Sequence, residues 1–303
     1  MAVEAEPAMP LTYKNPIIHK YLADPYVVWD QTAGAFFLLA TGKGADDRML
    51  PIYRSPDLAN WIFVRGAVAK GGETVWNFKN FWAPEVVKIG DTYHLYYTAS
   101  PKSPGNTGNR VGLAVARSIE GPYEDRGVVI THASIDGHLF IDDDGRMYFF
   151  YTIEHGNADG LAAGQIYACR MLAPDKVDSK PGQIVSHHPW QEGPWLQKRN
   201  GKYWLTYSCG NWKNDTYHVR YAIGDSPLGP FRERPEKILQ STETVKGPGH
   251  HSMFKDRKGG DWICYHGWDV KFTARYPRID RIHFGSDKIS SDGPTSTAQP
   301  FDK

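Results

Sequence analysis

The chain has 303 residues, of which 41% are hydrophobic and 13% aromatic, and 35 basic against 34 acidic side chains leave a formal net charge of +1. This composition supports a packed core, and the balanced charge predicts neither nucleic acid nor an anionic membrane surface as a partner. No stretch reaches the about 18 consecutive apolar residues of a membrane span, and three scattered cysteines indicate neither a disulfide framework nor a zinc cluster.

In chain order, residues 1–16 lack the basic start and apolar stretch of a signal peptide. Strand signals then dominate over helical periodicity. Short aromatic or β-branched runs bounded by Gly, Asp, Asn or Pro predict strands at 111–118, 146–153, 164–171, 202–210, 217–225 and 261–269. The polar residues from 290 to the end are expected to fray.

One phrase recurs five times: a polar or aromatic start, a turn and an aromatic-rich strand. The copies begin at Asp24, Trp82, Asp136, Glu192 and His250, so successive starts are 58, 54, 56 and 58 residues apart. A fixed period of this size indicates an array of one repeated unit, and strand-rich units favour a propeller. We therefore predict an all-β, five-bladed β-propeller in which residues 1–303 form a single domain.

The repeat brings the first residue of each unit near the central axis, where Asp24, Asp136 and Glu192 would meet His250. Burial raises the pKa of a carboxyl group, and neighbouring carboxylates push their pKa values apart. Glycoside hydrolysis needs this separation, because one carboxyl group must donate a proton while another stays ionised. The alternative is that each acid only caps backbone amides. Long loops at 67–80, 100–109, 153–164 and 210–215 are expected to shape this end of the axis.

The ordered motifs ADPYVV, FWAPEV, SIDGHLFIDDDG, EGPWL and GPGHHS, spread over residues 15–285, resemble glycoside hydrolase family 43. The resemblance implies a five-bladed propeller that inverts the anomeric centre. By position, it implies Asp24 as the general base and Glu192 as the general acid. It implies that Asp136 tunes the pKa of the acid and holds it in orientation.

The resemblance also implies a metal, commonly calcium, near His250, which matches the histidine of the family's G-x-G-H motif. One imidazole among waters is a weak calcium site, since calcium prefers oxygen ligands. A histidine that only organises axial water is the alternative.

Substrate contacts are implied in the same way. Trp82, preceded by Asn80 and Phe81, would stack on the sugar, although a core tryptophan is the alternative. Arg275 would point at the sugar hydroxyls, with Arg278 as the alternative register and a salt bridge as the alternative role. His138 follows Asp136 by two residues and would point to the same side of its strand.

The implied substrates are xylo- and arabino-oligosaccharides, and walling loops favour release of terminal xylose or arabinofuranose. We expect no C-terminal β-sandwich of the kind that many xylosidases of this family carry, and this expectation favours a compact endo- or exo-acting α-1,5-arabinanase as the alternative. A non-catalytic sugar-binding propeller would not need three acids, and a scaffold for protein partners is favoured still less.

Overall fold

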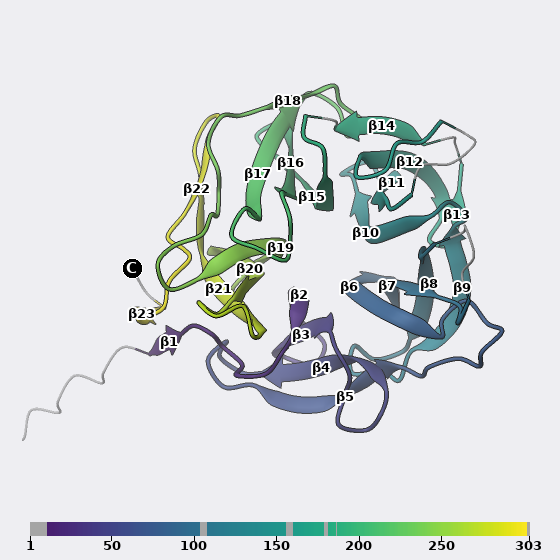
Figure 1. Cartoon of the computed structure of the whole chain (residues 1–303), viewed down its shortest axis with the longest axis horizontal. Helices are drawn as coiled ribbons and strands as arrows, with labels where there is room; N and C mark the ends of the chain where they lie inside the picture. Colours follow the sequence, from purple (N-terminus) through teal and green to yellow (C-terminus); the bar gives the residue numbers. More distant parts are fainter. Residues whose placement is uncertain (1–10, 104–107, 156–159, 179–180, 186, 302–303) are drawn as a thin grey trace, which may run out of the picture.

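The computed structural model describes residues 11–103, 108–155, 160–178, 181–185 and 187–301. Every regular element in those ranges is a β-strand, and no helix there has the length and apolar character needed to cross a membrane. Five antiparallel sheets stand like blades around a central axis (Figure 1). The predicted all-β, five-bladed propeller is confirmed.

Each blade is a consecutive stretch of chain, with its first strand at the axis and its later strands toward the rim (Figure 1). The first blade contains β2 (Ala23–Asp30), β3 (Ala35–Thr41), β4 (Met49–Ser55) and β5 (Ile62–Val68). The second contains β6 (Lys79–Ile89), β7 (Thr92–Ser100), β8 (Arg110–Ala116) and β9 (Glu124–Ile130). The third contains β10 (Ser134–Ile141), β11 (Met147–Ile153), β12 (Ile166–Ala173), β13 (Lys176–Val177) and β14 (Gly182–Val185).

The remaining two blades follow the same order. The fourth contains β15 (Gln191–Arg199), β16 (Lys202–Cys209), β17 (His218–Gly224) and β18 (Phe231–Glu233). The fifth contains β19 (Lys246–Lys255), β20 (Asp261–Trp268), β21 (Arg275–Phe284) and β22 (Ile289–Ser291). Strand β3 is buried at every residue, and the other second strands are buried at all but one or two residues. Neighbouring blades cover both of their faces, which explains their continuous apolar runs.

The two ends of the described chain pair with each other. Strand β1 (Thr12–Lys14) lies antiparallel to β23 (Ala298–Pro300), so the expectation that all residues from 290 onward fray is wrong. Among the strands of the described ranges, none is exchanged between blades one and five. Instead, Asn15 donates its side-chain amide to Ile279 O at 2.8 Å and accepts from Ile279 N at 3.0 Å, which ties the N-terminal segment to the last blade.

A bulge interrupts the innermost strand of every blade. In each of these strands a bulge residue at an equivalent position has left-handed backbone geometry: Asp24, Ala83, Asp136, Gly193 and His250, with φ between 45° and 61°. L-residues pay roughly 1–2 kcal/mol for this geometry. The residues of blades two and four that correspond to Asp24, Asp136 and His250 are Ala83 and Gly193. Each lies one residue after the repeat start predicted from the sequence, Trp82 or Glu192.

The second strand of each blade carries a buried polar side chain that contacts the next blade. Four of these side chains accept a hydrogen bond from the backbone N–H of the left-handed residue: Thr41 from Ala83, Thr98 from Asp136, Ser208 from His250, and His266 from Asp24. The fifth, Thr152, donates to Gln191 O. This ring of polar contacts joins the blades around the axis and holds the bulges in place.

We predict that Thr98→Val lowers the free energy of unfolding by about 1–3 kcal/mol, because it leaves the buried N–H of Asp136 without an acceptor. Urea unfolding followed by tryptophan fluorescence measures the change. The matched control is Thr74→Val at an exposed site, for which a change within about 0.5 kcal/mol is expected. Equal effects of the two substitutions would refute the structural role of Thr98.

Candidate active site

A cavity of about 430 Å³ opens at one end of the propeller axis. Its volume lies within the range of small-molecule sites. It is lined by Asp24, Trp82, Ile135, Asp136, Glu154, His155, Trp190, Glu192, Trp212, His250 and Arg275. The three predicted catalytic acids, which are more than 50 residues apart in sequence, thus share one cavity.

Asp24 lies at the start of β2 and is almost fully buried. Its Oδ2 accepts a hydrogen bond from Thr41 Oγ1 at 2.6 Å. Its Oδ1 lies 3.2 Å from Nδ1 of His266, 3.5 Å from Nδ1 of His250 and 3.6 Å from Nη1 of Arg275. Burial alone would raise the pKa of Asp24, but these nitrogen groups outweigh burial and hold that pKa well below its ordinary value. Asp24 is therefore a carboxylate that can accept a proton.

Asp136 has the opposite balance. Burial raises its pKa to about 7, and the charges of Glu192 and Asp24 act in the same direction against the opposing effects of His250 and the Gly193 N–H. That N–H donates to Oδ2 of Asp136 at 3.1 Å. Asp136 therefore contacts the residue directly after Glu192 and can hold a proton near neutral pH.

Glu192 is held by two aromatic donors. Tyr217 donates its hydroxyl to Oε1 at 2.6 Å, and Trp190 donates its indole N–H to Oε2 at 2.6 Å. Both bonds are short. The carboxyl plane of Glu192 is consequently fixed toward the cavity wall that Trp190 forms.

His250 faces two of the acids rather than a group of metal ligands. Its Nδ1 lies 3.5 Å from Asp24 Oδ1 and 3.8 Å from Asp136 Oδ2. Burial lowers the pKa of His250, but Asp24, Asp136 and Glu192 together raise it above its ordinary value. Within the described ranges there is no group of three or more His, Cys, Asp or Glu side chains placed to hold a metal ion. Asp24 and Asp136 are the acids that face His250, whereas a calcium ion takes six to eight oxygen ligands.

The predicted substrate-binding residues divide into two groups. Trp82 and Arg275 line the cavity, and the Arg275 guanidinium lies 4.4 Å from the ring centre of Trp212. Asn80 and Phe81 are not among the lining residues. Asn80 donates to Asn109 Oδ1 at 2.9 Å, and Phe81 is buried with its ring stacked on Tyr97.

His138 also lies away from the cavity. The bulge at Asp136 breaks the alternation of β10, so the two side chains do not share a surface as the spacing of two predicted. His138 Nδ1 contacts Glu85 Oε2 at 2.9 Å, and its Nε2 accepts from Leu196 N at 2.9 Å. His138 therefore connects the inner strands of blades two, three and four.

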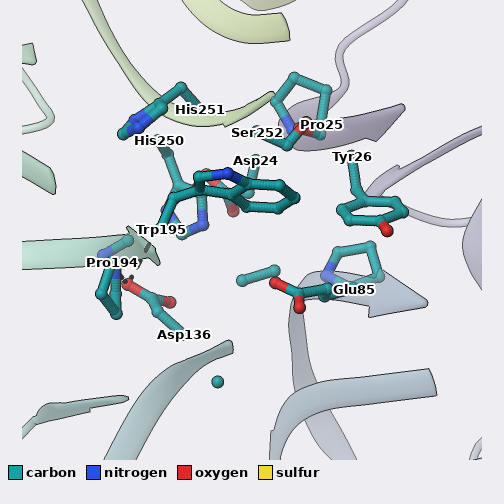
Figure 2. Close-up of a pocket in the computed structure, with 14 residues that line it drawn as sticks. Asp24, Pro25, Tyr26, Glu85, Asp136, Pro194, Trp195, His250, His251 and Ser252 are labelled. Atoms are coloured by element: carbon teal, nitrogen blue, oxygen red, sulfur yellow. Dashed lines mark hydrogen bonds and ion pairs between the residues drawn. The ribbon is translucent and has the colours of Figure 1, made fainter. Parts of the chain in front are cut away.

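A second, much smaller cavity of about 30 Å³ lies on the axis. Asp24, Asp136 and His250 line both cavities, so they separate the two. Figure 2 shows these residues with Glu85 around the indole of Trp195. The volume has room for one or two water molecules, which fits an axial water site.

Several residues of the site were not predicted from the sequence. Trp190 and Tyr217 donate hydrogen bonds to Glu192, while Thr41 and His266 contact Asp24. A signal existed for the last two, because Thr41, Thr98, Thr152, Ser208 and His266 recur at the period of the blades. Two of the four predicted loops line the cavity: 153–164 supplies Glu154 and His155, and 210–215 supplies Trp212. The described parts of 67–80 and 100–109 supply no lining residue of this cavity. Residues 104–107 and 156–159 of these loops lie outside the described residues.

Comparison with known proteins places this fold and cavity among enzymes that hydrolyse glycosides. The model of the glycosyl hydrolases family 43 matches residues 13–289. A β-D-galactofuranosidase of Aspergillus niger is 29% identical, with 89% of this chain and 82% of the relative aligned. A probable arabinan endo-1,5-α-L-arabinosidase A of Aspergillus flavus is 26% identical, over 81% of this chain and 87% of the relative. A crystal structure of a thermostable family-43 glycoside hydrolase superposes with a TM-score of 0.83 at 27% identity, covering 95% of this chain and 98% of that one.

A five-bladed propeller that gathers three carboxyl groups at one end of its axis has the architecture of a glycoside hydrolase. The family match covers most of the chain, and the chain belongs to glycosyl hydrolases family 43. The resemblance inferred from the sequence motifs is confirmed.

The raised pKa of Asp136 predicts a specific dependence of stability on pH. The folded protein keeps the proton up to about pH 7, whereas the unfolded chain releases it near 4, so this group's contribution to the free energy of unfolding is lost as the pH rises through 7. The amide side chain of the Asp136→Asn variant does not titrate, so the variant lacks this dependence on pH. We expect the stability of the variant relative to the natural protein to increase by more than about 1 kcal/mol between pH 5 and pH 8.

Urea unfolding at a series of pH values measures this difference. Asp91→Asn, at an exposed position, is the matched control and should run parallel to the natural protein. Parallel curves for Asp136→Asn as well would contradict the assigned environment of Asp136.

Proposed function

We propose that the protein is an inverting, exo-acting glycoside hydrolase that releases terminal xylose, arabinofuranose or both from hemicellulose oligosaccharides. The observation that carries this proposal is the meeting of Asp24, Asp136 and Glu192 in one cavity. Membership of a glycoside hydrolase family supports the reaction class.

The roles of the acids follow from their surroundings. Asp24, ionised beside His250 and Arg275, is the general base that activates water. Glu192 is the general acid that donates to the leaving oxygen. Asp136 acts on Glu192 through the hydrogen bond from the Gly193 N–H, which holds the acid in orientation.

The cavity supports recognition of one chain end. Its volume of about 430 Å³ is small for a groove that holds a long polysaccharide, since sites for single small molecules start near 300 Å³. Trp82, Trp190 and Trp212 offer aromatic faces to a sugar ring. Arg275 offers a fixed set of donors to its hydroxyls.

An α-1,5-arabinanase is the second candidate, favoured by the similarity to an arabinan endo-1,5-α-L-arabinosidase. The similarity to a β-D-galactofuranosidase adds that glycoside to the substrates to be tested. A non-catalytic sugar-binding propeller is disfavoured, because sugar binding alone would require neither three buried acids in one cavity nor the opposed pKa shifts of Asp24 and Asp136.

The first experiment measures hydrolysis of the 4-nitrophenyl glycosides of β-D-xylopyranose, α-L-arabinofuranose and β-D-galactofuranose, and of linear arabinan. Turnover of an aryl xyloside or arabinofuranoside with release of single sugars supports the exo-acting enzyme. Turnover of arabinan alone, with internal cleavage, would replace it by the arabinanase. Inactivity on all four would leave the binding propeller.

Two substitutions test the roles on the best substrate. Glu192→Ala should slow hydrolysis of an oligosaccharide by about 10²–10⁴-fold and spare the aryl glycoside, because only a poor leaving group needs the acid. Asp24→Asn should remove activity on both, since both reactions need activated water. Glu243→Ala, at an exposed site, is the control. Equal losses on both substrates for Glu192→Ala would refute its role as the acid.

The calcium ion predicted near His250 stays a prediction, and any such ion would depend largely on water ligands. The measurement is the rate of the chelator-treated protein before and after calcium is added, with metal content measured in parallel. Loss of activity that calcium restores would support the ion. Full activity of a calcium-free protein would contradict it.

A further inference from the structure

The acid and the base of the proposed reaction are connected through two residues that are not part of the lining of the substrate cavity. The first is Tyr217, which directly precedes β17, is fully buried and donates to Glu192 Oε1 at 2.6 Å. Burial, together with Glu192, raises the pKa of Tyr217 well above its ordinary value. Its hydroxyl therefore keeps its proton and remains a donor to the carboxylate.

The second residue is His266 on β20, which is 1% exposed. Its ring lies parallel to that of Tyr217, with a centroid distance of 5.8 Å and an interplanar angle of 6°. Its Nδ1 lies 3.2 Å from both the backbone N and Oδ1 of Asp24. A path of two stacked rings thus runs from the carboxyl group of the acid to that of the base.

The backbone of β19 leaves this stack no room to move. A Cβ atom built on Gly249 would lie 2.2 Å from Cε1 and 2.4 Å from Cδ1 of Tyr217. Contacts that short do not occur between real side chains, so Gly249 is needed for space rather than for backbone freedom. The ring of Tyr217 is confined between β19 and His266.

We propose that Tyr217 and His266 form a positioning pair that sets the geometry of the acid Glu192 relative to the base Asp24. This inference rests on the proposed function. An inverting reaction needs the two carboxyl groups held apart on opposite sides of the scissile bond, and an error of about 1 Å in such a group can cost about 10²-fold in rate. The pair supplies the rigid connection across blades four, five and one.

The test compares Tyr217→Phe with Tyr207→Phe. Tyr207 is an equally buried tyrosine of the same blade that donates to a different glutamate, Glu233, at 2.7 Å. For Tyr217→Phe we expect kcat on a disaccharide to fall about 10–100-fold, with KM within about twofold and the aryl glycoside slowed less than about threefold, because the acid matters only for the poor leaving group. Tyr207→Phe should change neither rate by more than about twofold.

His266→Phe keeps an aromatic ring against Tyr217 and removes the contact with Asp24. It should slow both substrates alike, by about tenfold or more, because it acts through the base. Since the two residues work as one unit, the double variant should lose less than the product of the single losses.

Gly249→Ala displaces the tyrosine ring without removing a polar atom, and it should reproduce the dependence on leaving group. Gly72→Ala, with no atom within 4 Å of its added Cβ, is its control. Gly249→Ala also answers the question if Tyr217→Phe does not fold.

The outcomes separate this inference from the function on which it rests. An active natural enzyme in which Tyr217→Phe behaves like Tyr207→Phe, or in which the losses multiply fully, would overturn the pair and leave the proposed function standing. Inactivity of the natural protein on every glycoside would overturn the proposed function and, with it, any positioning role.

Discussion

The left-handed residue in each innermost strand is the constraint on which the rest of the structure depends. It turns the strand at the axis. At four of the five junctions between blades, its backbone N–H donates a hydrogen bond to a side chain of the preceding blade. At the junction of blades three and four, the N–H of Gly193 goes instead to the carboxylate of Asp136. A contact between two residues of the cavity therefore replaces one of the structural contacts of the ring. The left-handed geometry of the non-glycine residues Asp24, Asp136 and His250 is strained, and it directs their side chains toward the axis.

Three carboxylates in one cavity would repel one another. The protein reduces this repulsion by giving each carboxyl group a different set of neighbours. Asp24 is surrounded by nitrogen groups from the last blade. Asp136 has one backbone donor and unfavourable charges nearby, and Glu192 has two aromatic donors. At neutral pH a proton is consequently favoured on Asp136 and disfavoured on Asp24.

A second set of contacts explains why some predicted binding residues serve the fold instead. Two residues beyond each left-handed position, a side chain bonds the backbone of the next blade: Tyr26 to Val86, Glu85 to Leu139, His138 to Leu196 and Ser252 to Val27. In the fourth blade, Trp195 occupies the equivalent position and packs against His138 at a ring distance of 4.7 Å. His138 thus has a structural role that its spacing from Asp136 concealed, because a bulge reverses the side on which it emerges.

The sequence by itself determined the number of blades and the convergence of Asp24, Trp82, Asp136, Glu192 and His250, because a regular repeat brings equivalent residues to equivalent places. The family and the place of Arg275 were indicated by the resemblance of the motifs. Only the tertiary structure decided that Ala83 and Gly193 occupy the bulges, that Phe81 and His138 are buried while Asn80 bonds to Asn109, and that Tyr217 and His266 connect Glu192 to Asp24. The physical reason is that these contacts join different blades, and bulges change the direction of a side chain without leaving a mark in the residue period.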